Sequence, residues 1–302
     1  MHFFNVNFFK EKFTFTFFEN IIKLGDDMDF RKVILKAKKE KYAIPQFNFD
    51  SLEILKFILE ECEKEKSPVF VATSEAAVSY MGGLTVIRNL VNDLIKTLNI
   101  TVPVMLHLDH GKTVDMCKNA IDAGYDSIMI DASKFSIDQN IAAVQEILNY
   151  KDVILECEVG AIGQHGNKNI IYASMEDCSK MIQNTKIFML APAIGTVHGL
   201  YKGKQRINTK LLGNINQKFN IPLVIHGGSG TKEEIIKECV KNGATKININ
   251  TELKIALTKA MRFYMKKHKK EIDYRKYYKY AEPFVKSVID KKIELFGSQN
   301  KA

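Results

Sequence analysis

Short apolar runs alternate with amphipathic segments from about residue 28 to the end of the chain. Eight of these runs are bounded by polar or glycine-rich stretches, which predicts strands at 42–48, 68–73, 102–108, 127–130, 153–158, 187–190, 223–226 and 246–250. The amphipathic segments between them predict helices, among them 52–64, 114–123, 137–148 and 232–241. Strands that are followed repeatedly by helices are typical of parallel βαβ units.

This repetition predicts an α/β protein built as a single TIM (β/α)8 barrel over residues 28–302. A doubly wound open sheet is the alternative, but no GxGxxG sequence follows an early strand, as a dinucleotide-binding sheet would require. The last amphipathic stretch, 274–296, is expected to form a helical arm that closes the chain. No linker or low-complexity segment divides these residues into further domains.

Residues 1–27 are rich in phenylalanine but show neither clean periodicity nor the features of a signal or transit peptide. An amphipathic segment begins at Met28. We therefore predict that translation begins at Met28 and that residues 1–27 are an N-terminal extension that is not native or is disordered. Detection by mass spectrometry of an N-terminal peptide from before Met28 would contradict this hypothesis.

The composition is that of a globular protein, since 46% of the 302 residues are hydrophobic and 26% are charged. This composition excludes a disordered protein. The sequence contains no uncharged apolar run of about 18 residues, so no transmembrane helix is predicted. The 5 cysteines are far apart and form no CxxC pair, so neither a disulfide framework nor a cysteine-based zinc site is indicated. A cytoplasmic location is expected.

The net charge is +9, and much of it lies in the lysine-rich stretch 262–279. Such a stretch indicates either a nucleic-acid surface or a solvated helix face. Lysines dominate it and no recognition module accompanies it, which favours the solvated face. We expect neither a nucleic-acid partner nor a membrane partner.

Three histidines follow predicted strands. His110, His198 and His226 come after the third, sixth and seventh strands, each beside a glycine. Three imidazoles and an open position form the ligand set of a catalytic zinc ion. The alternative is three separate core histidines, but their shared position at strand ends favours the metal site. His107 is expected to point to the face opposite His110 and to pack or to support the site.

Carboxylates also end the predicted strands. Asp109 adjoins His110 and could be a metal ligand, a supporting partner, a general base or the N-cap of the next helix. Asp131 and Glu158 end two further strands. They could bind a second metal ion or could have structural roles in turns.

Two segments indicate an anion site. Residues 227–230 read GGSG between a strand and a helix, so their backbone N–H groups could hold a phosphate. Residues 248–251 also end a strand before a helix, with Thr251 predicted as the N-cap. In a barrel these are the loops after strands seven and eight, the usual phosphate site of the fold. The alternative is a pair of tight turns that need glycine only for their backbone angles.

Together these segments resemble the class II, metal-dependent fructose-bisphosphate aldolases. The resemblance lies in LHLDHG at 106–111, GTVHG at 195–199, HGGSG at 226–230 and NINTE at 248–252, and it extends from about residue 28 to residue 302. More narrowly, the chain resembles the IIB branch, which also contains tagatose-bisphosphate aldolases. Four ordered motifs over a whole chain are far more specific than a single pattern.

The resemblance implies a reversible cleavage of fructose 1,6-bisphosphate to dihydroxyacetone phosphate and glyceraldehyde 3-phosphate, in glycolysis and gluconeogenesis, by zinc-stabilised enediolate chemistry. It implies zinc held by His110, His198 and His226, with Asp109 as the acid/base at the C4 hydroxyl. Asp131 and Glu158 match an alternative metal site. A monovalent cation, Na+ or K+, would bind carbonyls near Val197, Gly199 and Gly227. The implied substrate contacts are Asn48, Ser74, Gly199, Lys202, Gly227, Gly228, Ser229, Asn248, Ile249, Asn250 and Thr251.

The chain departs from this family pattern at three places. The loop 160–169 is short and lacks the usual acidic residues, so the proton shuttle at the enediolate carbon is not identified. Asn250 stands where many fructose-specific members have Asp. Lys254 stands where an Arg often reaches the second phosphate across a subunit interface, and the family implies a homodimer or homotetramer. The competing hypotheses are a tagatose-1,6-bisphosphate aldolase and a non-catalytic binding protein.

Overall fold

The computed structural model describes residues 29–163, 171–199, 201 and 205–302. The predicted N-terminal extension, residues 1–27, lies outside the described residues. So do Met28 and Lys202, and so does most of the short loop predicted at 160–169.

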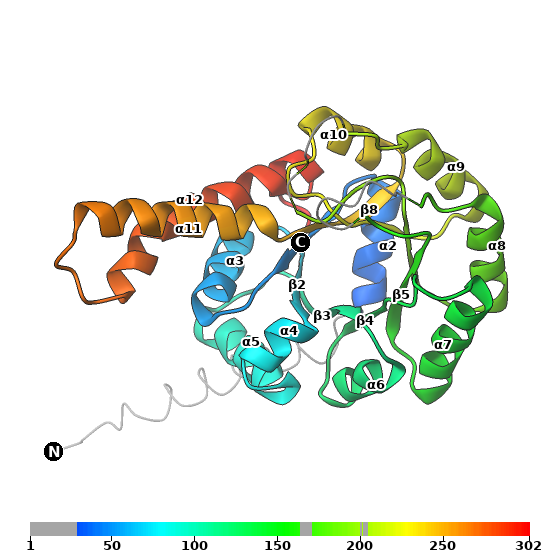
Figure 1. Ribbon diagram of the computed structural model, residues 1–302, viewed down its shortest axis with the longest axis horizontal. Helices are drawn as coiled ribbons and strands as arrows, with labels where there is room; N and C mark the ends of the chain where they lie inside the picture. The colour runs from blue at the N-terminus through cyan, green and yellow to red at the C-terminus, as the bar shows by residue number, and fades with distance from the viewer. Residues whose placement is uncertain (1–28, 164–170, 200, 202–204) are drawn as a thin grey trace, which may run out of the picture.

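Parallel strands close into a barrel in the order in which they occur in the sequence (Figure 1). They are β1 (Ile44–Asn48), β2 (Val69–Ser74), β3 (Val104–Gly111), β4 (Ser127–Ile130), β5 (Ile154–Val159), β6 (Met189–Pro192), β7 (Leu223–Ile225) and β8 (Ala244–Ile249). The last strand pairs with the first, Ile44 lying opposite Lys246, which completes the ring. The predicted TIM barrel is confirmed, and the open sheet is excluded.

Helices surround the barrel. They are α2 (Phe30–Glu40), α3 (Leu52–Lys64), α4 (Glu75–Tyr80), α5 (Leu84–Thr97), α6 (Val114–Asp122), α7 (Ile137–Tyr150), α8 (Met175–Asn184), α9 (Thr209–Phe219), α10 (Glu233–Lys241), α11 (Thr251–Lys267) and α12 (Arg275–Phe296). Many begin where a side chain satisfies a free backbone N–H group. Ser51, for example, accepts from Ile54, and Ser136 forms a capping box with Gln139.

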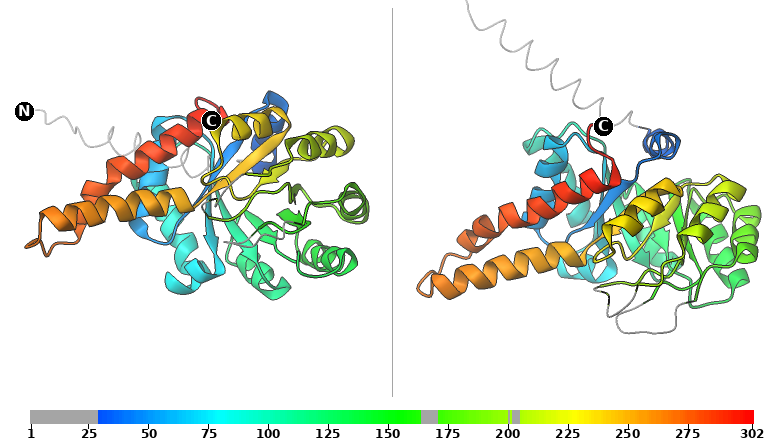
Figure 2. Two further views of the ribbon diagram at one scale, coloured as in Figure 1. Left: turned by 45° about the horizontal axis from the view of Figure 1, so that its top comes forward. Right: turned by 90° about the horizontal axis from the view of Figure 1, so that it is seen from above.

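The apolar side chains form two layers. The larger layer lies between the strands and the surrounding helices and contains residues such as Leu106 and Val144. The smaller layer fills the barrel interior and includes Phe70 and Met105. Ile34 and Ala37 of α2 join this inner layer, so α2 covers one end of the barrel (Figure 2). The inner layer closes that end to water, which leaves the opposite end for the polar residues.

The last two long helices form an arm. Helices α11 and α12 run side by side and project away from the barrel (Figures 1 and 2). Aromatic rings join them, since Tyr264 of α11 lies 5.1 Å from Tyr280 of α12 between ring centroids. None of the helices in the described part of the chain is long and apolar enough to cross a membrane.

Candidate active site

The three predicted histidines converge at the carboxyl-terminal end of the strands. His110 lies near the end of β3, His198 follows β6 and His226 follows β7. Their ring centroids are 4.7 to 5.9 Å apart. One nitrogen from each ring lies within 4.8 Å of the others, which is close enough for a single metal ion. The closest pair is Nε2 of His110 and Nε2 of His198, at 3.2 Å.

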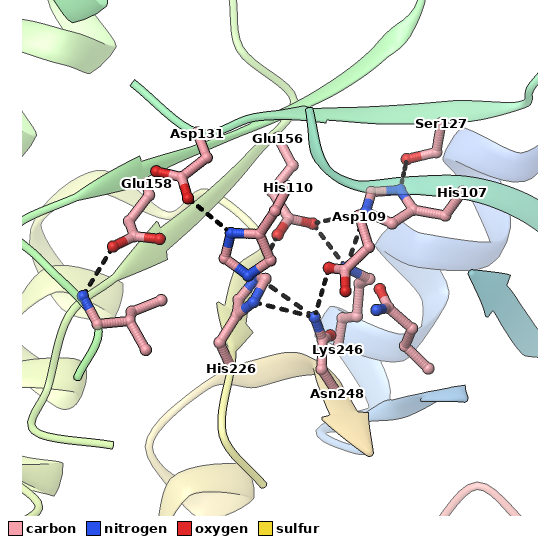
Figure 3. Close-up of polar contacts among 12 residues, drawn as sticks. His107, Asp109, His110, Ser127, Asp131, Glu156, Glu158, His226, Lys246 and Asn248 are labelled. Carbon is pink, nitrogen blue, oxygen red and sulfur yellow. Dashed lines mark hydrogen bonds and ion pairs between the residues drawn. The ribbon is translucent and has the colours of Figure 1, made fainter. Parts of the chain in front are cut away.

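The strand that carries His110 is irregular at this residue. Its φ is 55°, and the pairing of β3 with β4 shifts register between Leu108 and Gly111. This irregularity turns His110 toward the barrel interior, where simple alternation would point it away. The expectation that His107 and His110 lie on opposite faces is therefore wrong. His107 also lies inside the barrel, fully buried (Figure 3).

Asp131 orients the His110 ring. Its Oδ2 lies 2.8 Å from Nδ1 of His110, so Nδ1–H donates to the carboxylate and Nε2 is left for a metal ion. Burial alone would lower the pKa of His110, but Asp109 and Asp131 outweigh burial and raise that pKa to about 9. A metal ion at Nε2 would therefore displace a proton. Burial lowers the pKa of His198 to about 3, with His110 adding to the effect.

Asp131 and Glu158 also form a second possible metal group with His110. Glu158 accepts a hydrogen bond of 2.7 Å from the backbone N–H of Ile162. Burial, together with the nearby charge of Asp131, raises the pKa of Glu158 to about 7. Metal binding at this second group would require Glu158 to be ionised, so it would weaken as the pH falls below that value.

Asp109 lies beside the histidines and is 8% exposed. The amide of Asn48 donates to its Oδ2 at 2.7 Å, and the amide of Asn248 donates to its Oδ1 at 3.4 Å. Burial alone would raise the pKa of Asp109, but His110 and His226 outweigh burial and hold the pKa well below its usual range. The helix-cap alternative is wrong, because Thr113 is the N-cap of α6. Asp109 is an ionised carboxylate at the open end of the barrel.

The loops after β7 and β8 contact each other. Ser229 Oγ accepts from the backbone N–H of Asn250 at 3.2 Å and of Glu252 at 3.4 Å. The prediction of Thr251 as an N-cap is wrong, since Asn250 is the N-cap of α11 and forms no side-chain cap bond. The hydroxyl of Ser229, from the neighbouring loop, satisfies these donors instead. Both loops thus lie together at the start of a long helix, where its dipole favours an anion.

The glycines of these loops permit close backbone approach. Gly227 has a φ of 69°, and a Cβ there would collide with the backbone of Val197. Gly199 also has a positive φ, at 90°. Glycine at position 227 therefore lets this loop lie directly against the backbone of Val197, which a residue with a side chain would prevent.

The remaining predicted contacts lie in several environments. Ser74 is the N-cap of α4, and its hydroxyl accepts from Ala77. The side chain of Ile249 is fully buried in the outer core, so only its backbone is available to a ligand. Lys202 lies outside the described residues. Lys254 forms an ion pair of 2.7 Å with Asp50 of the same chain.

Three buried side-chain oxygens at this end of the barrel have no hydrogen-bond partner in the described part of the chain. They are Oε1 of Gln46, Oδ1 of Asn248 and Oδ1 of Asn250. Buried polar atoms are almost always hydrogen-bonded, so these acceptors are available to water or to a hydrogen-donating ligand. The hydroxyl groups of a sugar would supply such donors.

Two functional candidates were not found from the sequence. Glu156 of β5 and Lys246 of β8 form a fully buried ion pair of 2.7 Å inside the barrel. The signal was present, because a charged residue inside an otherwise apolar strand is uncommon unless it is paired. The pairing itself could not be read from the sequence, since the two residues are 90 positions apart.

A parallel barrel that gathers imidazoles, a carboxylate and glycine loops at one rim is the architecture of a metal-dependent barrel enzyme. The chain belongs to the class-II fructose-bisphosphate aldolase family, whose sequence profile matches residues 28–301. This family is metal-dependent, in agreement with the histidine and carboxylate groups.

The curated relatives that the chain resembles include proteins with the name fructose-bisphosphate aldolase. The relative from Staphylococcus aureus is 39% identical over 279 residues, which cover 90% of this chain and 98% of the relative. The relative from Geobacillus stearothermophilus is also 39% identical, over 90% of this chain and 97% of its own length. Among solved structures, the YdjI aldolase from Escherichia coli K12 has a TM-score of 0.80 at 29% identity, covering 91% of this chain and 98% of that one.

Proposed function

We propose that this chain catalyses the reversible aldol cleavage of fructose 1,6-bisphosphate to dihydroxyacetone phosphate and glyceraldehyde 3-phosphate, as part of glycolysis and gluconeogenesis. The observation that carries the proposal is the convergence of three histidines beside the ionised carboxylate of Asp109. The names of the relatives favour the fructose bisphosphate over its tagatose epimer. The non-catalytic alternative leaves this arrangement without a purpose.

The proposed metal ion is zinc, held by His110, His198 and His226. Three neutral imidazoles with an open fourth position suit zinc, which prefers nitrogen ligands and a tetrahedral arrangement. When bound, zinc acts as a Lewis acid that stabilises the negative charge developing beside the substrate carbonyl. Asp131 and Glu158 would offer an alternative position that shares His110. Backbone carbonyls near Val197, Gly199 and Gly227 are the proposed site of Na+ or K+.

Asp109 is the proposed acid/base. It would take the proton of the C4 hydroxyl as the bond between C3 and C4 breaks, and return it in the reverse direction. The amides of Asn48 and Asn248 fix the carboxylate from two sides, so its free lone pairs have a defined direction. A base that is already positioned lowers the entropic part of the barrier.

The loops after β7 and β8 would bind a phosphate group of the substrate. Gly227, Gly228 and Ser229 are proposed to contribute from one loop, and Asn250 and Thr251 from the other. Ser74, Gly199, Lys202 and the backbone of Ile249 are the further proposed contacts. The helix dipole of α11 favours the phosphate charge, and binding there would place the reacting carbons beside Asp109.

We also propose that the chain forms a homodimer or homotetramer through its arm. Large apolar side chains are exposed on the arm, including Phe263 at 48% and Ile272 at 92%. Exposed apolar residues gathered on a projecting element favour an interface. The lysine side chains of the stretch 262–279 are proposed to be solvated rather than to form a nucleic-acid surface. The proposed location is the cytoplasm, where unpaired cysteines remain reduced.

The test is an assay of fructose 1,6-bisphosphate cleavage by the purified chain, before and after chelation, with zinc then added back. We expect the chelator to abolish activity and zinc to restore it. Activity that survives complete metal removal would contradict the proposal. The tagatose epimer serves as the control substrate, and faster turnover of tagatose 1,6-bisphosphate would reassign the physiological substrate.

A further inference from the structure

A network of buried polar side chains lies beside His110 and His226 (Figure 3). Glu156 and Lys246 are both 0% exposed and reach toward each other from β5 and β8. Lys246 Nζ donates to Oε2 of Glu156 at 2.7 Å. Burying charged groups so deeply costs desolvation free energy, which their attraction only offsets, so the pair is expected to have a role besides stability.

The second oxygen of Glu156 contacts one of the histidines. Oε1 lies 2.8 Å from Nε2 of His226. An ionised carboxylate only accepts hydrogen bonds, so Nε2 of His226 must carry its proton. In a neutral imidazole only one nitrogen is protonated. Nδ1 of His226 is therefore the nitrogen that presents a lone pair.

Lys246 holds the carboxylate in this position. Its ammonium group also lies 3.5 Å from Nε2 of His107 and 5.2 Å from the ring centroid of Phe70. His107 is fixed in turn, because its Nδ1 is 2.9 Å from Oγ of Ser127. Each member of the network is buried and packed on several sides, so the Glu156 carboxylate has little freedom to turn away from His226.

We propose that Glu156, held by Lys246, is a positioning residue of the metal site that fixes the ring of His226 with Nδ1 toward the metal ion. His110 has the same arrangement with Asp131, which receives Nδ1–H and leaves Nε2 for the metal. Carboxylate partners of this kind orient metal-binding histidines and raise metal affinity. The inference rests on the proposed metal role of the three histidines.

The first test compares the zinc dissociation constants of four full-length proteins by competition with a chelator. Glu156→Leu/Lys246→Met removes both charges together, so that no buried charge is left unpaired, and it also removes the acceptor for His226. Glu156→Gln/Lys246→Met removes the same charges but keeps a neutral acceptor. The control is Arg88→Met, which breaks the partly buried ion pair with Asp126 near the opposite end of the barrel. The fourth protein is the wild type.

We expect zinc binding to weaken about 10- to 100-fold in the Leu/Met double variant. The Gln/Met variant should recover most of this loss, and Arg88→Met should bind zinc as the wild type does. The visible spectrum of the cobalt-loaded protein should change only in the Leu/Met variant, since it reports ligand geometry. An unchanged zinc dissociation constant and cobalt spectrum in that variant would overturn the inference.

The second test uses only the wild-type protein, so it does not depend on whether a variant folds. NMR of the wild-type protein with 15N-labelled histidine reports which ring nitrogen of His226 carries the proton. We expect the Nε2–H form in the chelated protein, and the Nδ1–H form would overturn the inference. A wild-type protein that binds no zinc would instead overturn the proposed metal role, so the two failures are distinguishable.

Discussion

Replacing Lys246 by Met should strongly destabilise the protein, although the two side chains have nearly the same shape. Lys246 and Glu156 are 2.7 Å apart and fully buried. With an effective dielectric constant of about 20, their attraction is about 6 kcal/mol. That is similar to the cost of removing both charges from water, which is several kcal/mol for each ion. The intact pair is thus nearly neutral in its effect on stability.

Lys246→Met removes the attraction but leaves the desolvated carboxylate of Glu156 in the barrel. We expect the free energy of unfolding near pH 7 to fall by about 3–5 kcal/mol, the usual cost of breaking a buried pair. The double variant Glu156→Gln/Lys246→Met leaves no charge behind. Its loss should be smaller than that of Lys246→Met alone, although it replaces two residues instead of one.

The destabilisation should also depend on pH. In the wild type, burial alone would raise the pKa of Glu156, but Lys246 and the hydrogen bond from His226 hold it well below its usual range. Without Lys246, less of the rise in pKa caused by burial is cancelled, so the pKa of Glu156 in the folded variant is higher than in the wild type. A folded-state pKa above the unfolded value favours folding at low pH and opposes it as the pH rises. The deficit of Lys246→Met should therefore shrink from about pH 7 to about pH 5.

The assay is urea unfolding of the chelated proteins, so that metal binding does not contribute to the measured stability. Arg88→Met is the matched control, because its ion pair with Asp126 is only partly buried and should cost less. A Lys246→Met protein within about 1 kcal/mol of the wild type near pH 7 would refute the reasoning. A deficit that grows toward acid pH would also refute it.

Three further predictions concern activity and assembly. Asp109→Asn should lower kcat by about 10²- to 10⁴-fold because it removes the proposed base, while the zinc content measured by atomic absorption stays near that of the wild type; normal turnover would exclude Asp109 from proton transfer. Gly227→Ala should raise KM for fructose 1,6-bisphosphate, because its Cβ would collide with the backbone of Val197 and displace the phosphate loop; an unchanged KM would remove that loop from the site. Phe263→Ser should weaken self-association about tenfold or more in sedimentation experiments, since a buried Phe contributes about 1.5–3 kcal/mol. Ile272→Ser, at the tip of the arm, is the comparison variant. Self-association equal to that of the wild type in both variants would place the interface away from the arm.

Local patterns determined the elements. Helix α3 (Leu52–Lys64) and strand β4 (Ser127–Ile130) begin and end where the sequence predicts. Other strands differ by a few residues, and β3 runs on to Gly111, beyond the predicted end at Leu108. Polar residues such as Asp109 can continue a strand when a neighbouring strand pairs with them, which a pattern of apolar residues does not reveal.

The sequence by itself determined the barrel and most of the site. Repeated strand–helix units specify parallel strands, and parallel strands bring all their carboxyl ends to one rim. The sequence therefore predicts that His110, His198 and His226 lie together. Their grouping follows from topology, which the order of the segments already contains.

Only the tertiary structure decided how individual side chains point and which partners they find. The irregular backbone at His110 reverses the side-chain direction that strand alternation predicts. Ser229, which lies in the loop after β7, accepts a hydrogen bond at the start of α11, the role predicted for Thr251. The pairing of Glu156 with Lys246 joins residues that are 90 positions apart. Such contacts depend on the register of the strands and on the closure of the barrel, which bring distant residues together. The apolar pattern of a short segment predicts only which of its residues are buried.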